Sequence, residues 1–240
     1  THPMKDSFLS VFSLMSLALM SLNSCNHMCV QGTGEVVTRQ VDLNVMKGIV
    51  QSSAVPVEIA FGMNQKVEIT SHENLISLLE TSVESDLWYI DFKENVCSEG
   101  MRIKVTLPVL EKISIKGSGN VTGITPFQSP KLVLWIQGSG DLNLEISSED
   151  VEVEVDGSGD IKLAGRTNEL TVEINGSGNV DASALNAKEV KIENDGSGDV
   201  KIQVDDALEV DLNGSGSVYY KGNPPAIKMN KNGSGEVIKD

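Results

Sequence analysis

The side chains that could carry acid–base chemistry in this chain are mostly carboxylates: 34 Asp and Glu face 19 Lys and Arg, and the formal net charge is -15. An enzyme that cleaves acidic polysaccharides needs an acid or base in a cleft among substrate-binding cations. After residue 28 the chain offers one histidine, His72, and three scattered arginines, Arg39, Arg102 and Arg166. The carboxylates recur regularly, as on a solvated face. We therefore expect no catalytic residue, and a polysaccharide-active enzyme is the alternative.

The same carboxylates could bind calcium. Asp141 and Asp160 occupy equivalent positions in a sequence repeat, and carboxylates stacked about 4.8 Å apart repel unless a cation or an Asn relieves them. Calcium needs several oxygen ligands, and the nine-residue period of calcium-binding Gly-Gly-x-Gly-x-Asp arrays is absent here. We expect no metal site and no cofactor, and calcium binding is a second alternative.

The first cysteine suggests covalent lipid attachment. Residues 8–22 form an apolar and serine-rich run with the length of a signal-peptide core, too short to span a bilayer comfortably. The run ends in Leu22-Asn23-Ser24-Cys25, which resembles a bacterial lipobox. We expect residues 1–25 to be a lipoprotein signal peptide ending at a lipidated Cys25, which would anchor the protein in a membrane. An ordinary secretory leader is the alternative.

The other two cysteines, Cys29 and Cys97, could form a disulfide because an exported compartment is oxidising. Spacing alone does not establish that they are neighbours. No Cys-x-x-Cys or Cys/His metal spacing occurs.

Three aromatic residues fall at positions predicted to point outward from strands: Trp135, Tyr219 and Tyr89. Exposed aromatic rings can stack on sugars, so these three are candidate ligand contacts. Single exposed rings are also common on protein surfaces without any role.

All of these residues are positioned by a repeat. The tripeptide Gly-Ser-Gly occurs seven times at steps of 18 to 21 residues. Its glycines are candidate structural turns: Gly117, Gly119, Gly138, Gly140, Gly157, Gly159, Gly176, Gly178, Gly196, Gly198, Gly214, Gly216, Gly233 and Gly235. A fixed period of about twenty residues indicates a solenoid, whose units must stack to bury their apolar faces.

The residues around each tripeptide predict strands. The position four before the first glycine and the position four after it are apolar in all seven copies: Ile113, Leu134, Val153, Val172, Ile192, Val210 and Met229, then Val121, Leu142, Ile161, Val180, Val200, Val218 and Val237. Two before the glycine, the residue is apolar except for Asn194 and Lys231, and polar residues mostly alternate with these positions. This period of two predicts one strand running into the corner and another running out.

The repeat therefore predicts an all-β fold, a parallel β-helix with a Gly-Ser-Gly corner in each coil. Glycine would serve the corner by accepting positive φ and by letting successive coils approach closely. The residue after each corner, such as Asn120, Asp141 or Asn179, is mostly of a type that bonds its own turn backbone. The coil should be right-handed, since right-handed crossovers dominate parallel connections.

The chain before the regular repeats should be a less regular part of the same domain, with residues 26–116 as irregular coils and residues 117–240 as regular ones. Gly32-Thr33-Gly34 resembles a first weak copy of the repeat, and residues 51–55 resemble a second. The 65 residues from Ser52 to Gly117 would hold about three more coils, and residues 73–79 look helical.

The chain resembles the head GIN domain family of auto-transporter adhesins, found in exported proteins of gut Bacteroidetes. The resemblance rests on the opening Val30-Gln31-Gly32-Thr33-Gly34, on residues 57–59, 67–69 and 105–110, and on the repeated Gly-Ser-Gly-Asn/Asp. It implies a β-helix, an extracytoplasmic role and no defined catalytic residues.

These observations favour a non-enzymatic, lipid-anchored protein of the outer membrane or cell envelope, an adhesin or scaffold that binds a host or bacterial surface glycan or protein. The net charge argues against nucleic acid and against electrostatic docking on anionic lipid.

Overall fold

The computed structural model describes residues 29–240. The predicted signal peptide, residues 1–25, and the predicted lipidation site Cys25 lie outside the described residues.

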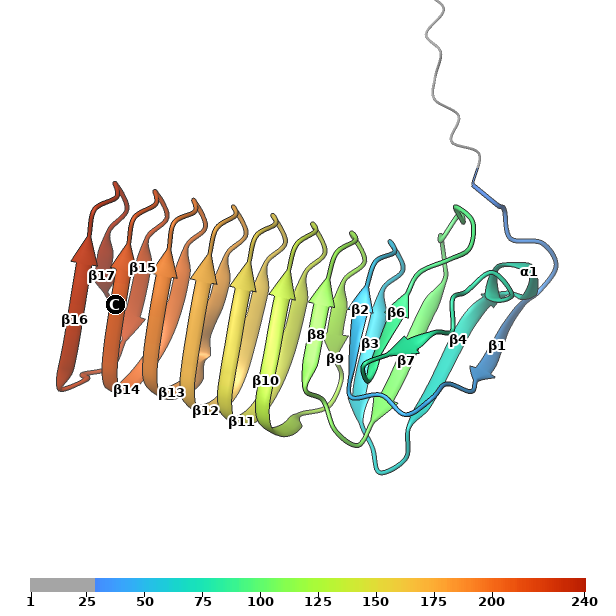
Figure 1. Ribbon diagram of the computed structural model, residues 1–240, viewed down its shortest axis with the longest axis horizontal. Coiled ribbons are helices and arrows are strands. Elements are labelled where there is room, and N and C mark those ends of the chain that lie inside the picture. The colour runs from blue at the N-terminus through green and yellow to red at the C-terminus, as the bar shows by residue number, and fades with distance from the viewer. Residues whose placement is uncertain (1–28) are drawn as a thin grey trace, which may run out of the picture.

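The described chain is a β-solenoid, as the repeat predicts (Figure 1). Its regular coils are β8 (Lys112–Ile115), β9 (Val121–Gly123), β10 (Phe127–Ile136), β11 (Leu142–Val155), β12 (Ile161–Ile174), β13 (Val180–Asn194), β14 (Val200–Leu212), β15 (Val218–Lys221), β16 (Ala226–Lys231) and β17 (Val237–Lys239). Neighbouring coils pair in parallel and nearly in register. Each long strand from β11 to β14 bends at the lower edge and joins a rear sheet to a front sheet (Figure 1).

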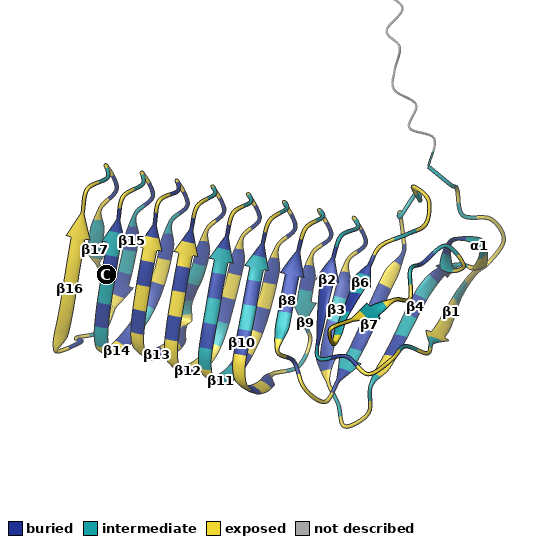
Figure 2. Ribbon diagram, in the orientation of Figure 1, coloured by how far each residue is buried: buried dark blue, intermediate teal, exposed yellow. Residues whose placement is uncertain are grey.

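The predicted apolar columns form the core. From Ile113 to Val210 the column before the corner is buried in every coil, and so is the column after it from Val121 to Val218. Only the last coil departs from this pattern, because Met229 is exposed and Val237 is half-buried. Figure 2 shows the resulting alternation of buried and more exposed positions along the long strands β10 to β14.

The corner glycines allow close packing of the coils. A Cβ atom on Gly178 would overlap the carbonyl oxygen of Gly159 in the preceding coil, and the other corners are equally tight. The expectation of positive φ is wrong, because positive-φ glycines in the described chain are Gly34, Gly100, Gly165 and Gly222, and none of these is a corner glycine. Larger residues are excluded from the corners because the backbones of successive coils approach closely, and not because the corner requires a positive φ.

The polar residue after each corner bonds the next coil and not its own turn, which corrects the sequence expectation. The backbone N–H of Asp160 donates to the Asp141 carboxylate at 2.9 Å, and the N–H of Asn179 donates to Asp160 at 2.8 Å. The series continues through Asp199 and Ser217. These side chains therefore join the coils along one edge of the solenoid.

Two buried amides stabilise corners from inside the core. Asn194, fully buried in an otherwise apolar column, accepts from the N–H of Gly196 at 3.1 Å and donates to the carbonyl of Gly198 at 2.9 Å. Gln51 makes the equivalent bonds to Ser53 and Val55. Gln51 also pairs with Ile115, the corresponding position of the first regular coil. Residues 51–55 are thus a corner without the glycines.

The N-terminal part of the described chain is not the series of about three successive coils that the sequence predicts. Its elements are β1 (Val36–Val41), β2 (Gly48–Gln51), β3 (Val57–Phe61), β4 (Lys66–His72), α1 (Glu73–Ile76), β5 (Val83–Glu84), β6 (Leu87–Ile90) and β7 (Arg102–Leu107). The coil of β2 and β3 lies between the coil of β6 and β7 and that of β8 and β9. Coil order in space therefore departs from coil order in sequence.

An N-terminal cap, defined here as β1, β4, α1 and the connections 42–47 and 62–65, closes this end of the solenoid. β4 pairs antiparallel with β7, and β1 pairs antiparallel with β4. The proposal that Gly32-Thr33-Gly34 is a copy of the corner is wrong, because Gly32 packs against His72 in the cap. A disulfide joins Cys29 to Cys97, with Cα atoms 5.1 Å apart. The Asn74 amide bonds to Gln31 and Thr33 and further fixes the incoming chain.

Candidate functional site

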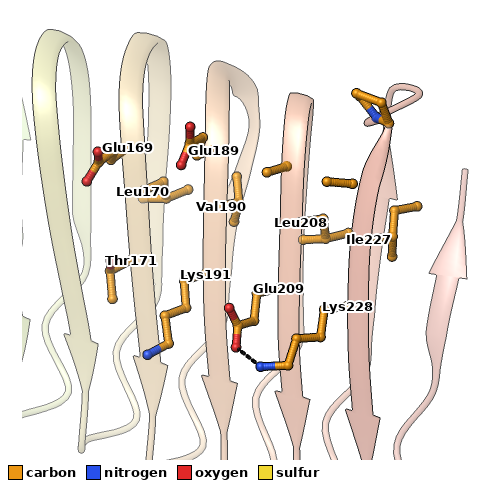
Figure 3. A pocket seen from close by; sticks show the side chains of 13 residues that line it. Glu169, Leu170, Thr171, Glu189, Val190, Lys191, Leu208, Glu209, Ile227 and Lys228 are labelled. Atoms are coloured by element: carbon orange, nitrogen blue, oxygen red, sulfur yellow. Dashed lines mark hydrogen bonds and ion pairs between the residues drawn. The ribbon is translucent and has the colours of Figure 1, made fainter.

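A hollow lies on the outward face of the front sheet, across β12, β13, β14 and β16 (Figure 3). Its volume is about 630 Å³. Each lining position follows from the register of the parallel strands: Glu169 pairs with Glu189, Glu189 with Ala207, and Ala207 with Ala226. We call this hollow the front groove. It forms because the outward side chains at this position of successive coils change from glutamate to the much smaller alanine.

The next outward column crosses the front groove with alternating charge. Lys191 lies beside Glu209 in register, and Glu209 lies beside Lys228. The Lys228 ammonium donates to the Glu209 carboxylate at 2.6 Å, and this hydrogen bond raises the pKa of Lys228 (Figure 3). Pro225 and Ile227 complete the wall toward β16. The groove thus offers carboxylates, ammonium groups and apolar carbon, a lining suited to binding a polar chain such as a glycan or an extended peptide.

An acidic row continues along the same face. Four carboxylates stand one coil apart in register: Glu154, Glu173, Glu193 and Asp211. Burial raises the pKa of Glu154, and the nearby charges of Asp156 and Glu173 raise it further. These carboxylates repel one another because similar coils stack about 4.8 Å apart and place like charges side by side.

The predicted aromatic contacts do not form one site. Trp135 and Tyr89 share an outward column of the front sheet, separated by Val50 and Ser114. Tyr219 lies on the rear sheet. The Trp135 indole N–H donates to Asp156 at 2.8 Å, and the Lys112 ammonium lies 5.5 Å from its ring centroid. Lys201 lies similarly, 5.9 Å from the Tyr219 centroid. The rings of Trp135 and Tyr219 therefore already make polar contacts within the protein.

The residues considered for catalysis lie apart. Arg39 on β1 pairs with Glu73, Arg102 is on β7, and Arg166 on β12 donates to Ser147. Within residues 29–240 there is no group of three or more His, Cys, Asp or Glu side chains arranged to hold a metal ion. In the same range, no helix is long and apolar enough to cross a membrane.

Sequence reasoning missed the front groove. Ala207, Ala226 and Pro225 carry no chemistry of their own, and they matter because they are small or rigid where neighbouring coils have glutamates. The available signal was the change from Glu169 and Glu189 to alanine at the aligned position of later coils.

Comparison with solved structures finds the same fold in crystal structures of bacterial proteins. A “putative adhesin” from Bacteroides fragilis is 23% identical with a TM-score of 0.84, and the alignment covers 88% of this chain and 100% of that one. A “putative adhesin” from Parabacteroides merdae is 21% identical with a TM-score of 0.69, covering 88% and 98%. A “putative lipid binding protein” from Parabacteroides distasonis is 21% identical with a TM-score of 0.68, covering 88% and 99%. Among curated proteins, none matches the chain.

A family model matches residues 46–224, which include the β2–β3 coil, the corners from Gly117 to Gly216 and most of the front groove. The chain therefore belongs to the family described as “putative auto-transporter adhesin, head GIN domain”.

Proposed function

We propose that this protein is a non-enzymatic, lipid-anchored adhesin or scaffold of the cell envelope. Its ligand, a surface glycan or a surface protein, would bind on the outward face of the front sheet, with the front groove as the main contact. The observation that carries this proposal is the groove itself, a mixed polar and apolar hollow built on a rigid sheet. Sites on regular strands hold their side chains in place without a loop rearrangement.

The anchor would be Cys25. Only residues 26–28 separate it from Cys29, which the disulfide ties to Cys97 in the connection between β6 and β7, beside the N-terminal cap. A rigid rod tied this closely to a membrane would present its distal coils, including the front groove, away from the bilayer. Because one protein of similar fold is called a lipid binding protein, lipids are a further ligand class to test on the same groove.

The test compares two matched substitutions on purified full-length protein. Ala207→Trp fills the front groove, whereas Ala164→Trp places the same bulk at another half-buried outward position, on the rear part of β12. Binding to whole bacterial and epithelial cells should weaken about tenfold, roughly 1.4 kcal/mol, in Ala207→Trp and stay unchanged in Ala164→Trp. Periodate treatment of the cells removes glycan receptors and protease treatment removes protein receptors. Equal binding by both variants would refute the groove as the contact.

A further inference from the structure

The most exposed large apolar side chains of residues 29–240 gather at one end of the solenoid. Met63 is 88% exposed, Val45 77% and Val36 57%. Val36 begins β1, Val45 lies in the connection from β1 to β2, and Met63 lies in the turn between β3 and β4. All three belong to the N-terminal cap, the end at which the chain enters the fold (Figure 1).

Two of these side chains are held in a fixed arrangement. The Gln65 side chain accepts from the N–H of Met46 at 2.9 Å and donates to the carbonyls of Asn44, at 2.9 Å, and Leu43, at 3.2 Å. Gln65 therefore fastens the connection that carries Val45 to the turn that carries Met63. Because the two segments are bonded together, Val45 and Met63 are presented as a pair and not on independent loops.

The charge of the protein is distributed unevenly along the solenoid. Residues 141–211 carry nineteen acidic and five basic side chains, whereas residues 29–76 carry five acidic and three basic ones. Within the cap, Arg39 pairs with Glu73 at 2.9 Å and Lys66 with Glu68 at 2.7 Å. The N-terminal cap itself is thus close to neutral, and the net charge of -15 comes mainly from residues 141–211.

We propose that the N-terminal cap is a membrane-contacting base, with Val45 and Met63 entering the interfacial region of the bilayer. This inference rests on the proposed lipid anchor at Cys25. Four Cα steps separate Cys25 from Cys29, a reach of at most about 14 Å. The disulfide fixes Cys29 to Cys97 beside the cap, and the Asn74 amide of α1 holds Gln31 and Thr33, so an anchored protein holds this end near the bilayer surface.

The charge distribution also favours one orientation of the solenoid relative to the bilayer. β11, where the most acidic coils begin, is four strand spacings from β4 along the rear sheet, about 19 Å. Electrostatic screening at physiological salt acts over about 8 Å, so an upright rod keeps its acidic coils out of the field of an anionic surface. A rod lying flat would bring them into that field. The base therefore favours an upright protein with the front groove exposed.

The experiment uses the full-length lipidated protein in vesicles of phosphatidylcholine and phosphatidylglycerol, with and without brominated phosphatidylcholine as a fluorescence quencher. Val45→Trp and Met63→Trp place a reporter in the base, and Met229→Trp, at a residue 43% exposed on β16 and outside the front groove, is the control at the far end. Trp88 and Trp135 are present in every variant, so each signal is read as the difference from the parent protein. Far-ultraviolet circular dichroism checks that each variant is folded.

The expected result is loss of the added emission from Val45→Trp and Met63→Trp in brominated vesicles, with a blue shift on binding, and neither change for Met229→Trp. Protein that floats with the vesicles while all three reporters behave alike overturns the base and leaves the anchor standing. Protein that fails to float refutes the anchor, and the base with it.

Discussion

The packing at the corners predicts a large effect from one added methyl group. In Gly178→Ala the new Cβ would lie 2.9 Å from the carbonyl carbon of Gly159 and 3.0 Å from a methyl group of Val155, with the Gly159 oxygen nearer still. Ordinary contacts of a Cβ atom begin near 3.4 Å. The neighbouring atoms are mostly backbone, so the coils must separate locally to admit the methyl group.

The cost can be estimated from what the separation disturbs. The N–H groups of Ser177 and Gly178 both donate to the carbonyl of Gly157, at 2.9 and 3.2 Å. Losing two such bonds costs about 1 kcal/mol each, and overpacking adds about 1–3 kcal/mol. We therefore expect Gly178→Ala to lower the free energy of unfolding by about 3–5 kcal/mol.

Urea denaturation followed by circular dichroism measures this loss, as a lower midpoint in the variant. Ser177→Ala is the matched control, because Ser177 is exposed at the same corner and loses only a hydroxyl group. Equal midpoints for the two variants would show that the coils are not packed closely at the corners, and would refute close backbone approach as the reason for the glycine repeat.

Three further outcomes are expected. Cys25→Ala should leave the protein exported but move it from the membrane to the soluble fraction, and equal membrane retention of both forms would contradict the lipid anchor. Val172→Asp places an unpaired charge in the core column and should cost several kcal/mol, roughly 3–5, seen as a fall in melting temperature; an unchanged value would contradict the burial of that column. The raised pKa of Glu154 means that folding favours its protonated form, so its destabilising effect is full above the folded pKa and disappears as pH falls below the unfolded value. Glu154→Gln should accordingly raise the melting temperature at neutral pH but not in acid, whereas Glu152→Gln, which breaks the hydrogen bond to Lys131, should not raise it at either pH.

The solenoid could be predicted from the sequence because its determinants are local and repeated. Gly-Ser-Gly marks the corner, and the flanking apolar positions, such as Val153 and Ile161, mark the two strands of each coil. Every coil repeats the same short-range pattern, so exceptions at single positions such as Asn194 do not obscure it. The same locality explains why the short helix begins at Glu73, where the sequence looks helical.

The candidate site depended on features that no single coil displays. The front groove exists because Glu189, Ala207 and Ala226 fall side by side in one outward column, which requires the register of three strands. Trp135 and Tyr89 share a face only because the β2 and β8 strands lie between their strands.

The sequence by itself therefore determined the β-helix, its core columns and its corners, since strand alternation and glycine turns are set by neighbouring residues. The tertiary structure alone decided that the β2–β3 coil lies between two later coils, that Cys29 meets Cys97, and that an antiparallel cap closes the N-terminal end. The physical reason is that strands without a glycine corner contain no local sequence signal that identifies the strand with which they pair. Their pairing is chosen by which edges remain open and by how much apolar surface each arrangement buries, and both are properties of the whole fold.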